Sequence, residues 1–367
     1  MSSEVPRFQS TDHVPDCSNV EHALAGNFRL QVSLTSKVHV AICDSSVAES
    51  ESGTSDCLVV TFFDNPWLDD ESYAERFKSL PASLAEIYNM HRSMQRFQED
   101  NHDSHLVVST GSNIFRAARF LTLLAGHLIL GLNTPSAKVQ AKINQVLSLF
   151  CDRFYDSPTI DLVRSRIDDS VAALDVTGKL EWVSFNLESS HALHINLKEY
   201  LHYDDGMNGA LHLIHPSRLL VFRTPSDLSG LHTWMDLENG QRIFSAAHYV
   251  EIFNDFEVQL VVHYGPASYD TNPLSAAGIE VEELPVGPTD LLAAVDRFLT
   301  LCTAVPGCVA LELDSGSDQD VVEALVAAYL MRRHGFPAAA AVAWIRMVHP
   351  PTPRTAGPCL RVRGSDL

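Results

Sequence analysis

One short arrangement occurs twice in this sequence and constrains its fold more than any other feature. It consists of an apolar strand, a polar turn, a long apolar helix and a second helix that opens with proline. The first copy begins at residues 105–109 (HLVVS), and its helix runs to about Leu130. The second begins at residues 308–313 (CVALEL) and, after a turn at 314–320, its helix runs to His334. Because the copies start about 200 residues apart, they predict a duplicated α/β domain, a central sheet flanked by helices in each copy.

The second helix of each copy supports this interpretation. Pro135 and Pro337 stand where these helices are expected to begin. Proline suits a first helical turn, because the N–H it lacks would have no partner there. Further short apolar runs at 28–34 and 58–63 indicate strands, and the spacing of apolar residues over 81–97 indicates a helix. A strand, a polar turn and a helix together present backbone N–H groups to an anion, so each turn is a candidate anion site.

The length of the chain allows two domains. With 367 residues, 46% of them hydrophobic, the chain can bury two cores of ordinary size. The predicted boundaries are an N-terminal flexible arm over 1–25, an N-terminal domain over 26–175, a linker over 176–205, a C-terminal domain over 206–350 and a tail over 351–367.

Charge and cysteine content narrow the classes of function. A formal net charge of −20 opposes binding to nucleic acid and to anionic membranes, because both need a basic surface. The seven cysteines are scattered and form no CxxC pair, which fits reduced thiols in a cytosolic or nuclear protein. The first thirty residues lack the apolar core of a signal peptide, so none is expected. The apolar runs elsewhere are too short or too amphipathic to predict a membrane span.

From residue 199 to residue 346 the sequence resembles the mitotic-exit dual-specificity protein phosphatases, a tandem-domain family of the protein tyrosine phosphatase superfamily. The matching segments follow in order at nearly the family's spacing: 199–203 (EYLHY), 215–222 (HPSRLLVF), 238–240, 247–249 with Phe253, 269–270, 277–278, 297–299, 329–334 and 343–346. The first half resembles the family's non-catalytic N-terminal copy more weakly, at 105–120 and 132–135. The resemblance implies an α/β fold with two tandem phosphatase-like domains.

The resemblance also places the family's signature loop, which is His-Cys, five residues and then Arg. Aligning through Tyr329 puts the histidine at Asp314, the cysteine at Ser315, the third-position glycine at Asp318 and the arginine at Val321. This chemistry needs a thiolate to attack phosphorus and a guanidinium to hold the phosphate oxygens. The four positions provide neither, and the carboxylates at 314, 318 and 320 would repel a phosphate dianion.

The general acid is missing as well. The family's acid loop corresponds to residues 284–290, where Asp290 is the nearest carboxylate. An aspartate before an apolar helical pattern is more often an N-cap than a catalyst, so Asp290 is expected to begin the helix over 291–302. Cys359, near the chain end, is expected to be an inert thiol.

Three other sets of residues could have a function, but the sequence favours a structural role for each of them. The turn before Arg116 could mimic a phosphate loop, but no cysteine precedes it. The acidic residues of 314–323 could bind Ca²⁺, but they lack EF-hand spacing. The pairs His191/His194 and His212/His215 could begin a zinc site, but surface or capping roles are expected for them. Tyr329 and Trp344 are expected to be core residues.

The sequence therefore predicts a pseudophosphatase without catalytic, cofactor-binding or metal-binding residues, which acts as a scaffold or structural subunit. We expect a protein partner or a large assembly, with no nucleic acid and no membrane. The expected location is cytoplasmic, with attachment to the cytoskeleton, such as that of a cilium or flagellum, as a further hypothesis. The alternative is a dual-specificity phosphoserine and phosphotyrosine phosphatase with weak or non-standard activity.

Overall fold

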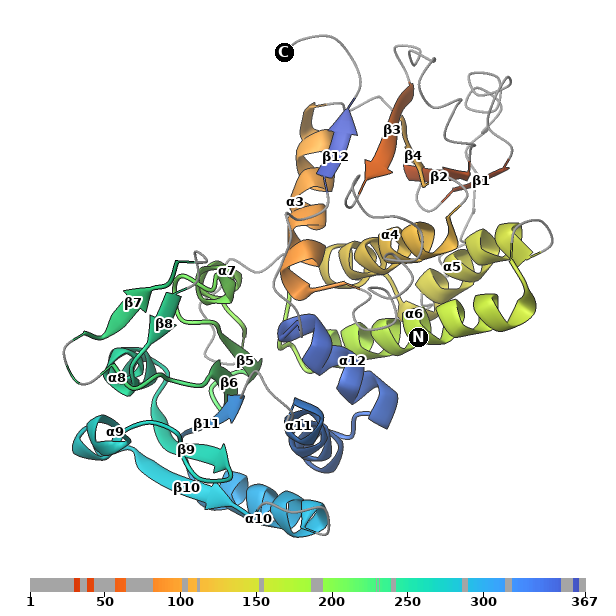
Figure 1. The fold of residues 1–367 in the computed structure, drawn as a ribbon. Coiled ribbons are helices and arrows are strands. Elements are labelled where there is room, and N and C mark those ends of the chain that lie inside the picture. Colours follow the sequence, from red (N-terminus) through yellow and green to blue (C-terminus); the bar gives the residue numbers. More distant parts are fainter. Residues whose placement is uncertain are drawn as a thin grey trace, which may run out of the picture.

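The structure is a computed structural model, and the parts of the chain that it describes form an α/β fold with two five-stranded sheets flanked by helices (Figure 1). The described residues are 30–33, 38–42, 57–63, 82–100, 105–110, 113–151, 155–185, 194–228, 230, 232–238, 242–285, 290–313, 319–350 and 359–362. The predicted arm, 1–25, lies outside them.

The first sheet is mixed and has the strand order β1-β2-β4-β3-β12. Its strands are β1 (Leu30–Ser33), β2 (Val38–Ile42), β3 (Cys57–Phe63), β4 (His105–Ser109) and β12 (Cys359–Val362). The central strand β4 is parallel to both neighbours, β2 and β3, whereas β1 and β12 pair antiparallel at the two edges. The strand before the first predicted turn therefore lies in the middle of its sheet.

Helices of the N-terminal half pack their apolar faces into a common core. They are α3 (Leu84–Asp100), α4 (Ile114–Gly126), the π-helical turn η1 (His127–Gly131), α5 (Ser136–Cys151) and α6 (Ser157–Lys179). Asn113 begins α4 by accepting a hydrogen bond from the Arg116 N–H at 2.9 Å. The segment Ile114–Gly131 is long and apolar enough to cross a membrane, but 89% of it is buried inside the protein. It is the central core helix of this half.

The second sheet has the order β10-β9-β11-β6-β5. The strands of this half are β5 (Leu211–His215), β6 (Leu219–Arg223), β9 (Val258–Tyr264), β10 (Glu280–Leu284) and β11 (Cys308–Leu313), with a separate hairpin of β7 (Trp234–Asp236) and β8 (Arg242–Phe244). Four strands of the sheet run parallel and only β5, at an edge, is antiparallel. As in the first sheet, the strand before the predicted turn, β11, lies in the middle.

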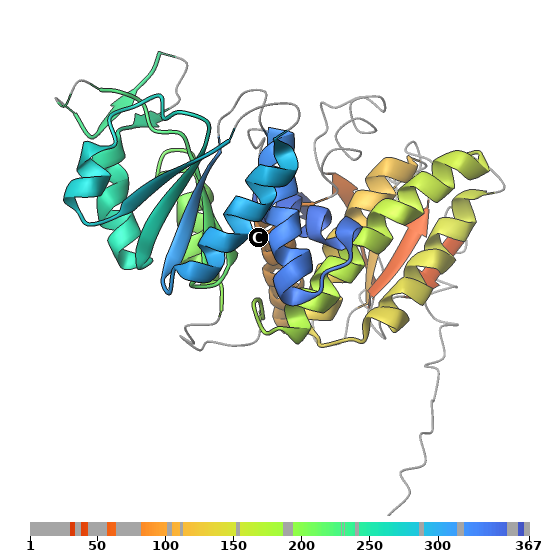
Figure 2. The ribbon, with the colours of Figure 1, turned by 90° about the horizontal axis from the view of Figure 1, so that it is seen from below.

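Helices cover both faces of this second sheet. They are α7 (Leu197–Asp204), α8 (Ala246–Asp255), α9 (Asn272–Ala276), α10 (Leu291–Ala304), α11 (Gln319–His334) and α12 (Ala338–Val348). Residues of α8 and α9 share one buried cluster with the sheet, and residues of α10 and α11 share the other (Figure 2). Because helices cover both faces of the sheet, its parallel strands are accessible at their ends.

The two halves share one continuous core. Helix α6 packs along α12, and the Trp182 side chain that follows α6 is 4% exposed. Its ring lies 4.6 Å from the ring of His215 and 5.7 Å from that of Phe336, measured between centroids. Buried apolar side chains thus hold the N-terminal and C-terminal halves together.

The predicted linker and the predicted tail both contain regular secondary structure. The predicted linker, 176–205, contains the end of α6 and all of α7, and the predicted tail, 351–367, contains β12. The domain boundaries over 26–175 and 206–350 remain predictions.

Candidate functional site

The candidate site lies at the edge of the second sheet where the parallel strands β6, β9, β10 and β11 end. Carboxyl ends of parallel strands meet at one edge, and ligands of open α/β sheets bind there. The predicted signature turn leaves β11 at this edge, but residues 314–318 lie outside the described part of the chain. The roles of Asp314, Ser315 and Asp318 therefore remain predictions.

The first turn of α11 is described, and it begins at Gln319 rather than at Val321 as predicted. The side chain of Val321 is half-buried and packs against the core. Asp320 is exposed in the same turn, so the charge at this helix start is negative. Glu323, which the calcium hypothesis included, forms a salt bridge with Arg346 of α12, with an Nη2–Oε2 distance of 2.9 Å. This pairing gives Glu323 a structural role.

A buried polar cluster lies at the same end of the sheet, on β9, on β11 and on the segment that follows β9. His263 Nδ1 contacts the Glu312 carboxylate, and the Tyr269 hydroxyl lies 3.4 Å from His263 Nε2. Burial, with the nearby Glu312 carboxylate, raises the pKa of Tyr269, so its hydroxyl stays protonated. The geometry suits a chain in which Tyr269 donates to His263 and His263 donates to Glu312. Sequence reasoning missed this cluster, although a glutamate within the apolar strand 308–313 was a signal for it.

An open cleft lies beside this cluster, between the segment after β6 and strand β8. We call it the β6–β8 cleft; its lining residues are Arg223, Thr224, Pro225, Ser226, Asp227, Ile243, Phe244 and Ser268. Its volume is about 360 Å³. Arg223 is paired in register with Leu313, the last residue of β11, so the cleft adjoins the start of the predicted signature turn.

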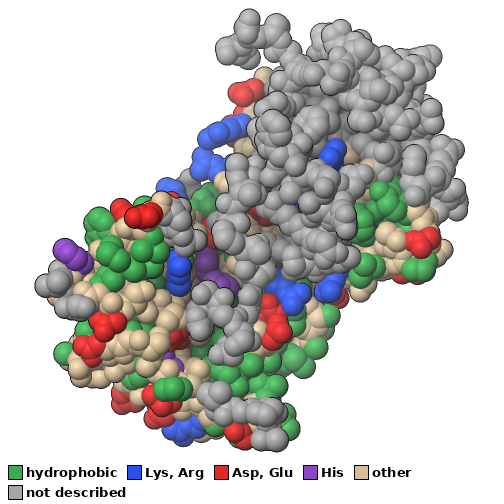
Figure 3. Space-filling model, in the orientation of Figure 1, with side chains coloured by type: hydrophobic (Ala, Val, Ile, Leu, Met, Phe, Trp, Pro, Cys, Tyr) green, Lys and Arg blue, Asp and Glu red, His purple; other side chains and the backbone are tan. Residues whose placement is uncertain are grey.

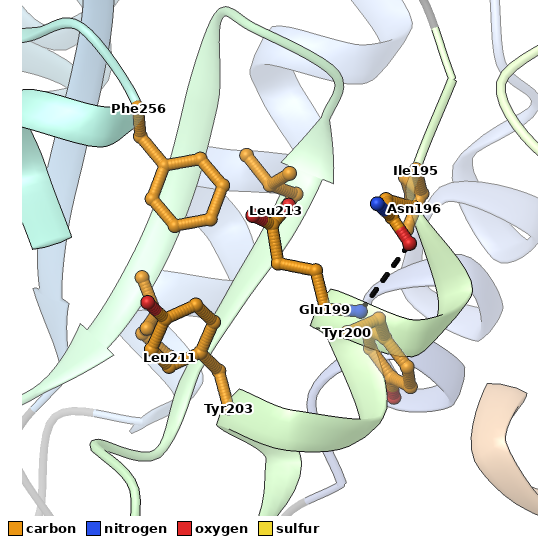
Figure 4. A pocket seen from close by; sticks show the side chains of 8 residues that line it. All are labelled: Ile195, Asn196, Glu199, Tyr200, Tyr203, Leu211, Leu213 and Phe256. Atoms are coloured by element: carbon orange, nitrogen blue, oxygen red, sulfur yellow. Dashed lines mark hydrogen bonds between the residues drawn. The ribbon is translucent and has the colours of Figure 1, made fainter. Parts of the chain in front are cut away.

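A second hollow, beside α7, is too small to bind a ligand. Its volume of about 10 Å³ holds at most one water molecule (Figure 4). The Glu199 side chain lies there between Tyr203, Leu213 and Phe256, and burial followed by the Asp255 charge raises the pKa of Glu199. Asn196 Oδ1 accepts a hydrogen bond from the Glu199 N–H at 3.3 Å and caps α7. The hollow is part of the packing contact between α7 and the sheet.

Two cysteines in the described residues do not offer a nucleophile. Cys302 and Cys308 are both buried, and burial raises the pKa of each thiol to about 12. A thiol with such a pKa is protonated at neutral pH and reacts poorly. Asp290, the residue nearest to the missing acid, directly precedes α10 at the predicted N-cap position, but its side chain makes no capping hydrogen bond there. Cys359 lies in β12.

The described histidines do not form a metal centre. Within the described residues no group of three or more His, Cys, Asp or Glu is placed to hold an ion. His212 Nε2 lies 2.9 Å from Asp204 Oδ1, and His215 Nδ1 lies 2.8 Å from the Tyr329 hydroxyl. The prediction of surface or capping roles is wrong for His212, which is 5% exposed, because a carboxylate and a second imidazole satisfy its ring inside the fold. The predicted burial of Tyr329 and Trp344 is confirmed.

Comparison with known proteins shows which proteins the chain is similar to. No family model matches it. In sequence it is similar to dual-specificity protein phosphatases, which supports the predicted family. The relatives include the dual specificity protein phosphatase CDC14C of Homo sapiens, 31% identical over 157 residues, which are 42% of this chain and 33% of that protein. CDC14B of Mus musculus is 30% identical over 173 residues, 47% of this chain and 33% of that protein.

The chain thus spans about a third of the length of these curated relatives, with 33% of each covered. Among solved structures, a putative protein tyrosine phosphatase from Leishmania major is 20% identical and covers 37% of this chain and 81% of its own. Its TM-score of 0.28 is too low to support a structural argument. The similarity to the phosphatases therefore rests on sequence.

Proposed function

We propose that this chain is a pseudophosphatase that acts by contact, as a scaffold or structural subunit, and not by hydrolysis. The observation that carries the proposal is the first turn of α11. Val321 stands where the resemblance puts the phosphate-binding arginine, and its aliphatic side chain packs against the core. An arginine there would clamp two phosphate oxygens as charge moves in the transition state.

The charge around this turn supports the same proposal. Asp320 is exposed in the first turn of α11, where a helix otherwise favours an anionic ligand. A carboxylate already interacts with the positive end of the helix, and a phosphate dianion would be repelled by it. The buried thiols of Cys302 and Cys308, held protonated, do not replace the nucleophile that the sequence lacks at Ser315.

The enzymatic test uses the full chain with phosphoserine and phosphotyrosine peptides and with para-nitrophenyl phosphate. We expect no hydrolysis above a heat-denatured control. In the fourfold variant with Asp314→His, Ser315→Cys, Asp318→Gly and Val321→Arg, vanadate binding should appear, whereas turnover should stay far below that of an active phosphatase because the general acid is still missing. Hydrolysis by the unmodified chain that survives a second, independent purification would refute catalytic silence.

The contact role has a separate test. A scaffold should be found mostly in complexes, so native size fractionation of cell extracts should place the chain above its monomer mass of 40.5 kDa. Association with a cytoskeletal assembly, including that of a cilium or flagellum, belongs to this proposal. Recovery only as a free monomer would contradict it.

A further inference from the structure

The β6–β8 cleft has the dimensions of a binding site. Ligand pockets usually have volumes of roughly 300–1,000 Å³ and combine apolar walls with a few convergent polar groups. This cleft, of about 360 Å³, has Ile243 and Phe244 on β8 and hydroxyl groups on Thr224, Ser226 and Ser268. Its place at the carboxyl edge of parallel strands is where α/β proteins bind ligands.

Its polar groups include two donors that the described residues satisfy poorly or not at all. The Arg223 guanidinium makes one long hydrogen bond, 3.5 Å, to the Arg242 carbonyl oxygen, and among the described residues it forms no ion pair. The Thr224 hydroxyl is buried without a hydrogen-bond partner in the described structure. A buried hydroxyl without a partner costs free energy, and a ligand oxygen that accepts its hydrogen bond would remove this cost.

The charge of the cleft selects among possible ligands. Arg223 supplies one positive charge, and the exposed Asp227 that also lines the cleft supplies one negative charge. A guanidinium binds a single carboxylate with two parallel hydrogen bonds. A phosphate dianion would be repelled by Asp227 and only partly neutralised by one arginine. A singly charged carboxylate therefore fits best.

Beside the cleft, the β7–β8 hairpin exposes large apolar side chains. Trp234 is 45% exposed and Met235 is 42% exposed, and Figure 3 shows hydrophobic side chains gathered over this hairpin. They are paired in register with Phe244 and Ile243, the two β8 residues that line the cleft. The Arg242 guanidinium lies 3.9 Å from the centre of the Trp234 ring and holds it in place. Exposed aromatic and methionine side chains are enriched in protein interfaces.

We propose that the β6–β8 cleft is a docking site for a protein segment that carries a carboxylate beside an apolar side chain. Arg223 and the Thr224 hydroxyl bind the carboxylate, and Trp234 and Met235 contact the apolar neighbour. This proposal rests on the proposed contact function and specifies the chemistry of the partner.

The test measures binding of 3-phenylpropanoate to the full chain by isothermal titration calorimetry. The neutral isostere 3-phenylpropanamide and the dianion phenyl phosphate serve as comparison ligands. We expect a dissociation constant of about 1 mM or lower for the carboxylate, as its size allows, and at least about tenfold weaker binding of both comparison ligands. Equal binding of the amide, tighter binding of the phosphate, or no carboxylate binding at 10 mM, a concentration of about ten times that constant, would overturn the proposal.

Variants locate the binding. Arg223→Gln should weaken carboxylate binding about tenfold or more, whereas Arg332→Gln, the same charge change at an exposed position of α11, should leave it unchanged. Thr224→Val keeps the shape of the side chain and removes only the hydroxyl, so it should weaken binding without lowering the melting temperature. Unchanged affinity in both cleft variants would refute the site. Phosphatase activity would refute catalytic silence and leave these binding results intact, so the two failures are distinguishable.

Discussion

At the scale of single residues, Glu86 combines a helix cap with a buried ion pair. Its Oε2 accepts a hydrogen bond from the Ser83 N–H at 2.8 Å, while the Ser83 hydroxyl accepts one from the Glu86 N–H at 3.3 Å, which is a capping box at the start of α3. Its Oε1 lies 2.6 Å from Arg119 Nη2 in a buried ion pair. Glu86→Ala removes the cap and leaves a buried guanidinium without this carboxylate. We expect a loss of about 3–5 kcal/mol in the free energy of unfolding.

Urea denaturation measures this loss. Glu99→Ala, at an exposed position of the same helix, is the control and should change stability by less than about 0.5 kcal/mol. Equal effects of the two substitutions would show that the buried pair adds nothing beyond helix propensity.

Buried histidines make stability depend on pH. Burial, with the neighbouring His91, lowers the pKa of His127 to about 4, and burial lowers that of His212 to about 3. Below about pH 6.5, the ordinary value, the unfolded chain binds protons that the folded chain does not. The contribution of neutral His127 and His212 is therefore complete above pH 6.5 and decreases as the pH falls towards 4 and 3.

The free energy of unfolding should thus decrease between pH 6.5 and pH 4.5, by up to about 1.4 kcal/mol per pH unit for each such group. Urea titrations at several pH values measure the slope. His127→Gln should make the slope shallower, and the exposed His232→Gln should not. An unchanged slope in His127→Gln would mean that His127 is already protonated in the folded protein.

At the scale of elements, one aromatic side chain, that of Trp182, packs beside the contact between α6 and α12. Trp182 packs on His215 of β5 and on Phe336 and Trp344 beside and within α12. Trp182→Ala should reduce the free energy of unfolding by about 3–5 kcal/mol, because it removes a large buried apolar side chain and leaves a cavity. Trp234→Ala, which changes an exposed tryptophan, should cost less than about 1 kcal/mol. Similar costs for both would show that the contact between the halves is loosely packed.

The elements that the sequence predicted best are those with one strong local signal. The strands at 105–109 and 308–313 have the predicted bounds, and α12 begins directly after Pro337. The strand β2 was missed, because five residues with a histidine among them carry little periodicity. The helix after Asn113 ends in a π-helical turn that no residue pattern indicated, where Gly131 leaves room for the His91 ring. The pairing of β12 with β3 joins distant segments, which local patterns do not specify.

The candidate site was less predictable than the fold. The resemblance pointed to the correct edge of the sheet, through the turn after β11, but the β6–β8 cleft depends on three segments that only tertiary structure brings together. Arg223 and Thr224 have no motif spacing with Ser268. Their proximity follows from the parallel pairing of β6, β11 and β9, which puts the ends of these strands at one edge.

At the scale of the whole molecule, a net charge of −20 opposes compaction, and the shared core counters it. One buried cluster includes Phe120 and Leu174 from the N-terminal half together with Val262 and Trp344 from the C-terminal half. Within the C-terminal half, the Tyr200 hydroxyl of α7 donates a hydrogen bond to the Val348 carbonyl oxygen of α12 at 2.8 Å. Neither half can unfold without exposing apolar surface of the other.

The two halves should therefore unfold together, although chains with two sheets of this size often unfold in two steps. Scanning calorimetry should show one transition, with a van't Hoff enthalpy close to the calorimetric enthalpy. In urea, tryptophan fluorescence and far-ultraviolet circular dichroism should give coincident curves, because Trp182 and Trp344 lie in the core that both halves share. Trp182→Ala, which weakens that core at the contact, should separate the transition into two. Two transitions in the unmodified chain would show that each half is stable alone and that burial between them does not couple their folding.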